Sequence, residues 1–194
     1  MEWILASASP RRKELLGQLI EKFDVIPSQG EEKTDGTLSP EMLVKTLAEQ
    51  KATEVATYST ARGKIVLGAD TVVAFDGKVL GKPKDEADAF SMLSMLSGQM
   101  HEVYTGVCIV YPKNGGTEKL VAAARTEVRF FSLTEEQIRA YIATGSPMDK
   151  AGAYGIQDGG LVERIQGSFS NVVGLPVELC AELIARVQAE TEGV

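Results

Sequence analysis

Hydrophobic residues follow two different spacings in the first part of this chain. Short apolar runs bounded by polar residues predict buried strands, and the four-residue spacing of Leu43, Leu47, Lys51 and Val55 predicts one face of a helix. The predicted strands are residues 3–5, 23–26 and 65–67, and the predicted helices are residues 10–18 and 40–57. This alternation of strands and helices is typical of an α/β protein.

Turn residues predict two hairpins in the middle of the chain. Asp76-Gly77 predicts a tight turn between strands at residues 71–75 and 78–80. Asn114-Gly115-Gly116 separates two longer strand patterns, which we expect to pair as an antiparallel hairpin. These longer patterns cover residues 102–111 and 119–131.

Capping residues predict the remaining helices. Asp85 is expected to cap a helix that ends near residue 97, and Thr134-x-x-Gln137 forms a capping box for a helix that ends near residue 143. Residues 144–175 hold seven glycines, which predicts a long, loop-rich functional region. A last helix begins at Leu175-Pro176, and residues 191–194 are expected to be frayed. The whole pattern predicts an α/β fold, in which a mixed twisted sheet with flanking helices forms two lobes around a central cleft.

Composition narrows the possible functions. The 194 residues are 44% hydrophobic and 24% charged, which is ordinary for one globular domain spanning residues 1–194. The net charge of −7 argues against broad nucleic-acid binding. The sequence has no apolar run long enough to span a membrane and no signal-peptide pattern. We therefore expect a cytoplasmic protein with neither a nucleic-acid nor a membrane partner.

Cysteine and histidine usage limits the choice of metal. Cys108 and Cys180 form no metal or redox motif, so we expect both to pack in the core. His101 is the only histidine, which excludes a His-rich zinc site and argues against a Ser-His triad. Any metal would be held by carboxylates and substrate phosphates, which favours Mg²⁺ or Mn²⁺.

The start of the first helix has an unusual charge pattern. Ser9 and Pro10 suit the N-cap and first helical positions, and Arg11 and Arg12 follow in the first turn. A helix N-terminus already carries partial positive charge, so two cations there favour a bound anion such as a phosphate. The alternative is a solvated first turn with no ligand.

Asp70 is the strongest candidate for chemistry. It follows an apolar strand and the two small residues Gly68 and Ala69, which allow close approach of another backbone. A carboxylate at the end of a strand can hold a metal or activate water. The alternative is an aspartate that only forms the turn between strand and hairpin.

Other polar residues allow both a functional and an ordinary interpretation. Lys51 lies on the apolar face of its helix, where it either extends to the surface or meets an anion in a cleft. Pro83 forces the backbone of Lys82 to be extended, which aims the lysine side chain in a fixed direction. The alternative is an ordinary solvated lysine in a surface loop. Glu31-Glu32 could join Asp70 in a metal site or form a solvated surface. Gln157 could read a pyrimidine edge, because its amide both donates and accepts hydrogen bonds, or it could belong to an ordinary polar loop.

Taken together, these segments resemble the Maf family of nucleotide pyrophosphatases over nearly the whole chain. Each motif is weak alone, whereas their order and spacing are specific. The motifs are Ser7-Ala-Ser-Pro-Arg-Arg12, Glu49-Gln-Lys-Ala52, Gly68-Ala-Asp-Thr71, Gly81-Lys-Pro83, Leu96-Ser-Gly98, Tyr104-Thr-Gly106, Met148-Asp-Lys-Ala-Gly-Ala-Tyr-Gly-Ile-Gln157 and Val173-Gly-Leu-Pro176.

The resemblance implies an ITPase-like fold and roles for individual residues. It implies hydrolysis of a nucleoside triphosphate to the monophosphate and pyrophosphate, dependence on Mg²⁺ or Mn²⁺, and frequent homodimerisation. Asp70 matches the catalytic carboxylate, described as the proton acceptor, and Glu32 matches a second acidic residue, with Glu31 as the alternative. Both Asp70 and Glu32 are expected to hold the metal. The residues that match the family's phosphate-binding positions are Ser7, Arg11, Arg12, Lys51 and Lys82. Lys82 is also expected to be catalytic.

The resemblance also predicts the base. Arg12, Thr71 and Gln157 match the subgroup that acts on dTTP and UTP, which makes these three residues substrate-binding. Asp158 departs from this subgroup, in which a glycine often follows the glutamine. The alternatives are the same reaction on a modified or purine nucleotide, and a non-catalytic nucleotide-binding regulator of septum formation.

Overall fold

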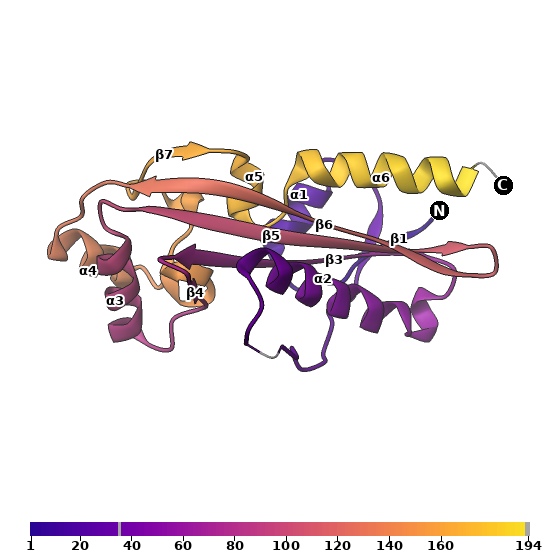
Figure 1. Ribbon diagram of the computed structural model, residues 1–194, viewed down its shortest axis with the longest axis horizontal. Coiled ribbons are helices and arrows are strands. Elements are labelled where there is room, and N and C mark those ends of the chain that lie inside the picture. Colours follow the sequence, from indigo (N-terminus) through magenta and orange to yellow (C-terminus); the bar gives the residue numbers. More distant parts are fainter. Residues whose placement is uncertain (35, 193–194) are drawn as a thin grey trace.

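A seven-stranded mixed sheet forms the centre of the protein, as the computed structural model shows for residues 1–34 and 36–192 (Figure 1). Its order is β2-β1-β3-β5-β6-β7, and β4 pairs with β3. β1 runs parallel to β2 and β3, and the other pairs are antiparallel. The strands are β1 (Trp3–Leu5), β2 (Phe23–Val25), β3 (Ile65–Phe75), β4 (Lys78–Leu80), β5 (Met100–Lys113), β6 (Gly116–Phe130) and β7 (Val162–Gln166).

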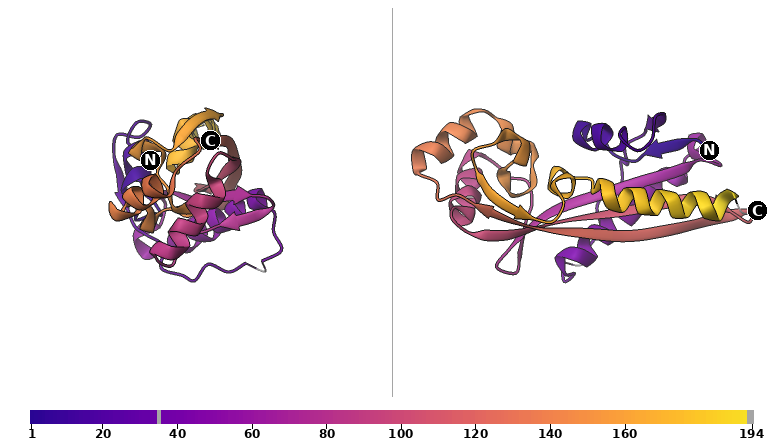
Figure 2. Two further views of the ribbon diagram at one scale, coloured as in Figure 1. Left: turned by 90° about the vertical axis from the view of Figure 1, so that its left-hand side faces the viewer. Right: turned by 90° about the horizontal axis from the view of Figure 1, so that it is seen from above.

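Helices cover both faces of this sheet, which confirms the predicted fold class (Figures 1 and 2). The α-helices are α1 (Pro10–Leu16), α2 (Pro40–Ala56), α3 (Glu86–Leu96), α4 (Glu135–Ala143), α5 (Phe169–Val173) and α6 (Val177–Glu192). The caps predicted at Ser9 and Asp85 are present, and Thr134 and Gln137 form both bonds of the capping box. None of the helices in the described part of the chain is long and apolar enough to cross a membrane.

β3 differs from its prediction. The sequence predicts separate strands at residues 65–67 and 71–75, but β3 continues through residues 68–70 without interruption. Gly68 lies against the backbone of α2, where an added Cβ would come within 2.6 Å of the carbonyl oxygen of Ala48. The small residue therefore serves close packing of a helix on the strand. Consequently Asp70 lies in the middle of a strand, and neither the strand-end nor the turn interpretation of its position is correct.

The region 144–175 is more ordered than predicted. It contains β7, α5 and three short 3₁₀ segments, η2 (Ser146–Asp149), η3 (Ala151–Ala153) and η4 (Ile156–Asp158). A fourth such segment, η1 (Ser59–Ala61), follows α2. At the C-terminus α6 continues to Glu192, beyond the start of the predicted fraying, and residues 193–194 lie outside the described part.

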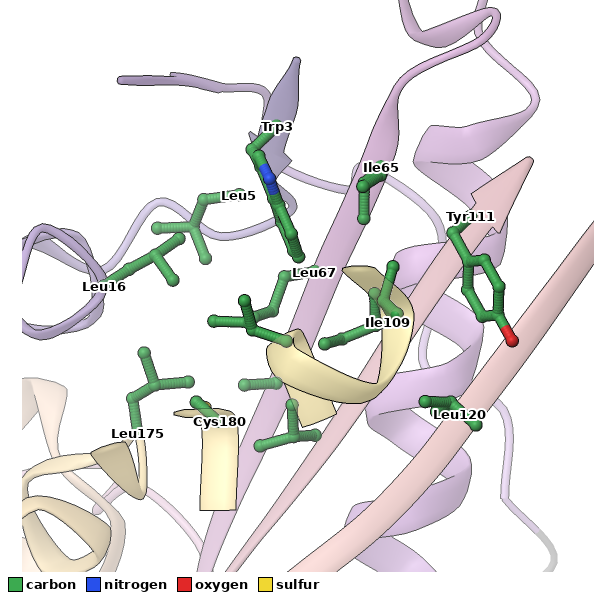
Figure 3. Close-up of a cluster of buried hydrophobic side chains, with 14 residues drawn as sticks. Trp3, Leu5, Leu16, Ile65, Leu67, Ile109, Tyr111, Leu120, Leu175 and Cys180 are labelled. Carbon is green, nitrogen blue, oxygen red and sulfur yellow. The ribbon is translucent and has the colours of Figure 1, made fainter. Parts of the chain in front are cut away.

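Three buried clusters follow the length of the sheet and form two lobes. The first cluster packs α1 and α6 against one face, around Trp3, Leu67 and Ile109 (Figure 3). The second cluster lies at the α3 and α4 end, around Leu93 and Phe130, and defines the other lobe. The third packs α2 on the opposite face of the first lobe. Cys108 and Cys180 are both buried and unpaired, as expected.

Candidate active site

A cleft of about 650 Å³ opens along one edge of β3, between the two lobes. On this edge β1 pairs with residues 65–67 and β4 with residues 73–75. The described strands leave residues 68–72 of that edge unpaired. Side chains from both faces of β3 therefore reach the same cleft around the open edge, which explains why Asp70 and Thr71, although adjacent, both line it.

Asp70 is buried at the floor of this cleft, on the face of the sheet that α2 covers. Its neighbour across the β3–β5 ladder is Gly106. Like Gly68, Gly106 lies directly beneath the backbone of α2. The Asp70 carboxylate accepts a hydrogen bond from the Lys51 ammonium at 2.5 Å. Burial raises the pKa of Asp70 above its ordinary value, while Lys51 and Arg12 oppose part of that rise.

Lys51 joins two carboxylates. Its ammonium lies 2.5 Å from Asp70 and 2.8 Å from Glu32, and its side chain is only 17% exposed. The lysine on the apolar face of α2 thus turns into the cleft and does not extend to the surface. Glu32 lines the cleft and Glu31 is not among the lining residues, so the structure brings Glu32 to Asp70.

Arg12 is built into the wall of the cleft by three hydrogen bonds. Its Nε donates to the carbonyl oxygen of Gly174 at 2.8 Å, Nη2 donates to Thr71 Oγ1 at 3.0 Å, and Nη1 donates to Ser7 Oγ at 3.3 Å. A guanidinium has five N–H donors, so two remain for a ligand. Ser7 is buried behind Arg12 and is not among the lining residues, whereas Ser9 is. In this structure Ser7 supports Arg12, and its contact with phosphate stays a prediction.

Further charged residues lie at the mouth of the cleft. Arg11 of α1 pairs with Asp149 of η2 at 3.3 Å, which links the two lobes. Asp149 also pairs with Lys150 at 2.9 Å. Lys82, just after β4, lines the cleft from the second lobe, and no ion pair to it occurs among the described residues. Gln157 lies on the same wall and is exposed.

The donor set fits a cation that arrives together with a phosphate ligand. Asp70 and Glu32 converge on one ammonium and provide hard oxygen donors, which Mg²⁺ and Mn²⁺ prefer. Within residues 1–34 and 36–192, no three histidine, cysteine, aspartate or glutamate side chains gather closely enough to hold a metal by themselves. The remaining ligands would have to come from phosphate oxygens and water.

Several residues of the cleft wall are not among the predicted site residues, and four of them stand out. Asp149, Lys150 and Tyr154 line the cleft, and the carbonyl oxygen of Gly174 holds Arg12. All four lie in the region read as loop-rich. Asp149, Lys150 and Tyr154 belong to a motif from which only Gln157 was selected. The charged pair and the glycines of this motif are the sequence features that could have indicated these residues.

Known proteins resemble this chain in sequence over most of its length. The family model described as "Maf-like protein" matches residues 2–187. A protein of Thermococcus gammatolerans named dTTP/UTP pyrophosphatase is 51% identical over 182 residues, covering 93% of this chain and 94% of the relative. A Bacillus cytotoxicus protein of the same name is 52% identical over 179 residues, covering 91% and 90%.

Solved structures share the fold at much lower identity. The Ham1 protein of Staphylococcus aureus has a TM-score of 0.56 at 15% identity, with 96% of this chain and 99% of that chain covered. The HAM1 protein of Coxiella burnetii has a TM-score of 0.54 at 15% identity with the same coverage. With a family match over nearly its full length and relatives at half identity, the chain belongs to the Maf-like protein family.

Proposed function

We propose that this protein hydrolyses dTTP and UTP to the nucleoside monophosphate and pyrophosphate. The names of its relatives at about half identity support this substrate pair. The observation that carries the proposal is the placement of a buried carboxylate, Asp70, beneath a cleft that five cationic side chains line. These cations are Arg11, Arg12, Lys51, Lys82 and Lys150.

The cationic residues bind the triphosphate, and the carboxylates act on water. Hydrolysis breaks the bond between the α- and β-phosphates, and a water molecule supplies the new oxygen. Asp70 accepts the proton of that water, and its raised pKa makes it a stronger base than an ordinary carboxylate. Arg11, Arg12, Lys51 and Lys82 stabilise the negative charge that moves onto the leaving pyrophosphate.

Glu32 and Asp70 would hold Mg²⁺ or Mn²⁺ when it enters with the nucleotide. When bound, the cation would neutralise phosphate charge and lower the pKa of a coordinated water. Activity should therefore disappear in EDTA and return when Mg²⁺ or Mn²⁺ is added in excess. Full turnover in the presence of the chelator would contradict the assignment of these two residues to a metal.

Gln157, Thr71 and Arg12 select the base. Uracil and thymine share the O2, N3–H and O4 edge, and the Gln157 amide can accept from N3–H and donate to a carbonyl. With the amide held in this orientation, cytosine presents an acceptor at N3 and an amino group in place of O4, which leaves polar groups unpaired. Each unpaired group costs about 1–3 kcal/mol, which is sufficient for a strong preference.

The test is a panel of nucleotides with separate detection of pyrophosphate and orthophosphate. We expect dTTP and UTP to be preferred over CTP and over purine triphosphates, with label from the γ-phosphate appearing only in pyrophosphate. Equal kcat/KM for CTP and UTP would contradict the substrate assignment, and orthophosphate in the first turnover would contradict the bond that is broken. A preferred purine or modified nucleotide would favour the same reaction on a different base.

The proposal extends to location and assembly. Resemblance to the family supports a cytoplasmic homodimer that interacts with neither nucleic acid nor membranes. Light scattering at several concentrations measures the oligomeric state directly, and a constant mass of one chain would contradict the dimer.

A further inference from the structure

The turn that carries Gln157 is held at both ends by one phenol oxygen. The backbone N–H of Gly155 donates to Tyr141 Oη at 2.9 Å, and Tyr141 Oη donates to Asp158 Oδ2 at 2.6 Å. Gln157 lies between these two anchored residues in η4. The 3₁₀ bond from the Asp158 N–H to the Gly155 carbonyl, at 3.1 Å, closes the turn itself.

The directions of these hydrogen bonds are chemically consistent. Burial opposes ionisation of Asp158, but hydrogen bonds from Ser146 and Tyr141 outweigh it and lower the pKa of the carboxyl below its ordinary value. The ionised carboxylate can only accept, so the single proton of the phenol points to Asp158. The lone pairs of the phenol are then free to accept from Gly155.

Tyr141 is held in place by a well-packed helix. Tyr141 belongs to α4, whose residues Ile138 and Ile142 are buried in the second cluster. A second donor, Ser146 Oγ, reaches the same Asp158 oxygen at 2.6 Å, and Lys150 donates in turn to that hydroxyl at 2.9 Å. The carboxylate is therefore held from two directions, by α4 and by η2.

Gln157 has no comparable support of its own. Among the described residues no hydrogen bond or ion pair involves its side chain, which is exposed on the cleft wall. The backbone of the turn therefore fixes the point at which this side chain enters the cleft, while its torsions adjust to the ligand. That backbone is set by Gly155 and Asp158.

We propose that Tyr141 and Asp158 are positioning residues that determine base selectivity by fixing the turn of Gln157 against the cleft. This inference rests on the proposed function, in which Gln157 reads the uracil or thymine edge. Neither residue needs to contact the nucleotide. They limit where the amide can lie, and small displacements of a positioned group have large kinetic effects.

Tyr141→Phe is the most direct test, because it removes one oxygen and with it both hydrogen bonds. We expect the ratio of kcat/KM for UTP to that for CTP to fall by about tenfold or more, because a displaced Gln157 amide no longer meets the base edge that distinguishes the two nucleotides. Asp158→Ala should behave in the same way. Asp158→Asn should retain most of the ratio, since its amide oxygen still accepts from Tyr141 and Ser146.

Tyr111→Phe is the matched control. It removes a phenol oxygen that donates to Glu190 at 2.7 Å, in the first lobe and away from the cleft. Its UTP/CTP ratio should equal that of the unmodified protein. Hydrogen exchange gives a readout independent of activity. The backbone amides of residues 155–159 should exchange faster in Tyr141→Phe than in the unmodified protein, and their rates should not change in Tyr111→Phe.

The outcomes separate this inference from the proposed function. If the unmodified protein does not prefer UTP over CTP, the proposed function fails. If it does, and Tyr141→Phe is equally selective, the inference is overturned. An equal loss of activity on every nucleotide, accompanied by a lower Tm, would also overturn it, because the two residues would then only stabilise the lobe.

Discussion

Asp70 combines burial with ionic partners. Taking a carboxylate out of water disfavours its charged form, and this effect raises the pKa of Asp70. The Lys51 ammonium at 2.5 Å limits the rise and keeps the group hydrogen-bonded. A fixed carboxylate with a raised pKa suits the proton-accepting role that we propose for Asp70.

Asp70→Asn should lower turnover by about a hundredfold or more, the scale of losing an acid–base or metal-orienting group. Binding of the triphosphate should persist, because the cationic residues remain and one negative charge near the anion is removed. Steady-state kinetics and calorimetric binding of a non-hydrolysable triphosphate measure the two effects separately. Glu31→Gln is the control, since Glu31 is not among the cleft-lining residues. Turnover close to normal in Asp70→Asn would show that this carboxylate has only a structural role.

His101 predicts a pH dependence of stability. It is 1% exposed, its Nε2 lies 2.8 Å from Tyr154 Oη, and burial lowers its pKa to about 4. The unfolded chain, with a histidine pKa of about 6.5, binds more protons between these values, so stability falls as pH decreases from about 6.5 to 4. Between pH 7 and pH 5 this group should account for about 2 kcal/mol of the free energy of unfolding.

The variant His101→Gln measures that contribution. Its amide keeps a polar partner for Tyr154 but does not titrate. Urea denaturation at both pH values should show a smaller loss of stability on acidification than in the unmodified protein. An identical loss in both proteins would mean that other groups cause the acid sensitivity.

At the scale of elements, the contact of α2 with the sheet determines the geometry of the carboxylates. Gly68 and Gly106 lie on adjacent strands under α2, and a Cβ on Gly106 would come within 2.2 Å of the carbonyl oxygen of Val44. The absence of side chains lets the helix backbone rest directly on β3 and β5. That close approach brings Lys51 of α2 to Asp70 of β3.

Gly106→Ala should displace α2 and separate Lys51 from Asp70. We expect the free energy of unfolding to fall by about 1–3 kcal/mol, as for other overpacked sites, and turnover to fall by at least about tenfold. The control is Gly116→Ala, where the nearest atom to a new Cβ is 3.8 Å away. Denaturation and kinetics on both variants test the idea, and a fully active Gly106→Ala would contradict it.

Local signals predicted most elements, and long-range contacts explain the rest. The caps at Ser9, Asp85 and Thr134 and the turn at Asn114 depend on neighbouring residues, so the sequence alone located them. The continuity of β3 through Gly68 could not be predicted, because it depends on α2 covering that strand. Likewise the hydrogen bond from Tyr141 to Asp158 and the ion pair of Arg11 with Asp149 join residues that only the fold brings together.

At the scale of the whole molecule, the long strands belong to both lobes (Figure 2). β3 contributes Leu67 to the first cluster and Val73 to the second, and β5 contributes Ile109 and Val103 in the same way. Separating the lobes would therefore require breaking strands and not only moving a linker. The single domain expected from the sequence stays a prediction, and this continuity supports it.

Unfolding should accordingly occur in one transition. Trp3, the single tryptophan, reports on the first cluster by its fluorescence, and hydrogen exchange in α3 and α4 reports on the second. Both should give the same midpoint in urea, as two-state unfolding requires. Two separate midpoints would show that the lobes are independent units and that the single-domain prediction is wrong.

The interrupted edge of β3 also bears on behaviour at high protein concentration. An unpaired strand edge is a template on which a foreign chain can add a strand, and such edges promote aggregation. Here the open stretch, residues 68–72, is about 16 Å long at the usual rise of a strand, and β1 and β4 close it at both ends. Another polypeptide would have to insert between those strands and displace charged side chains such as Lys51. The interruption that makes room for the cleft therefore leaves no usable docking edge for a neighbouring molecule.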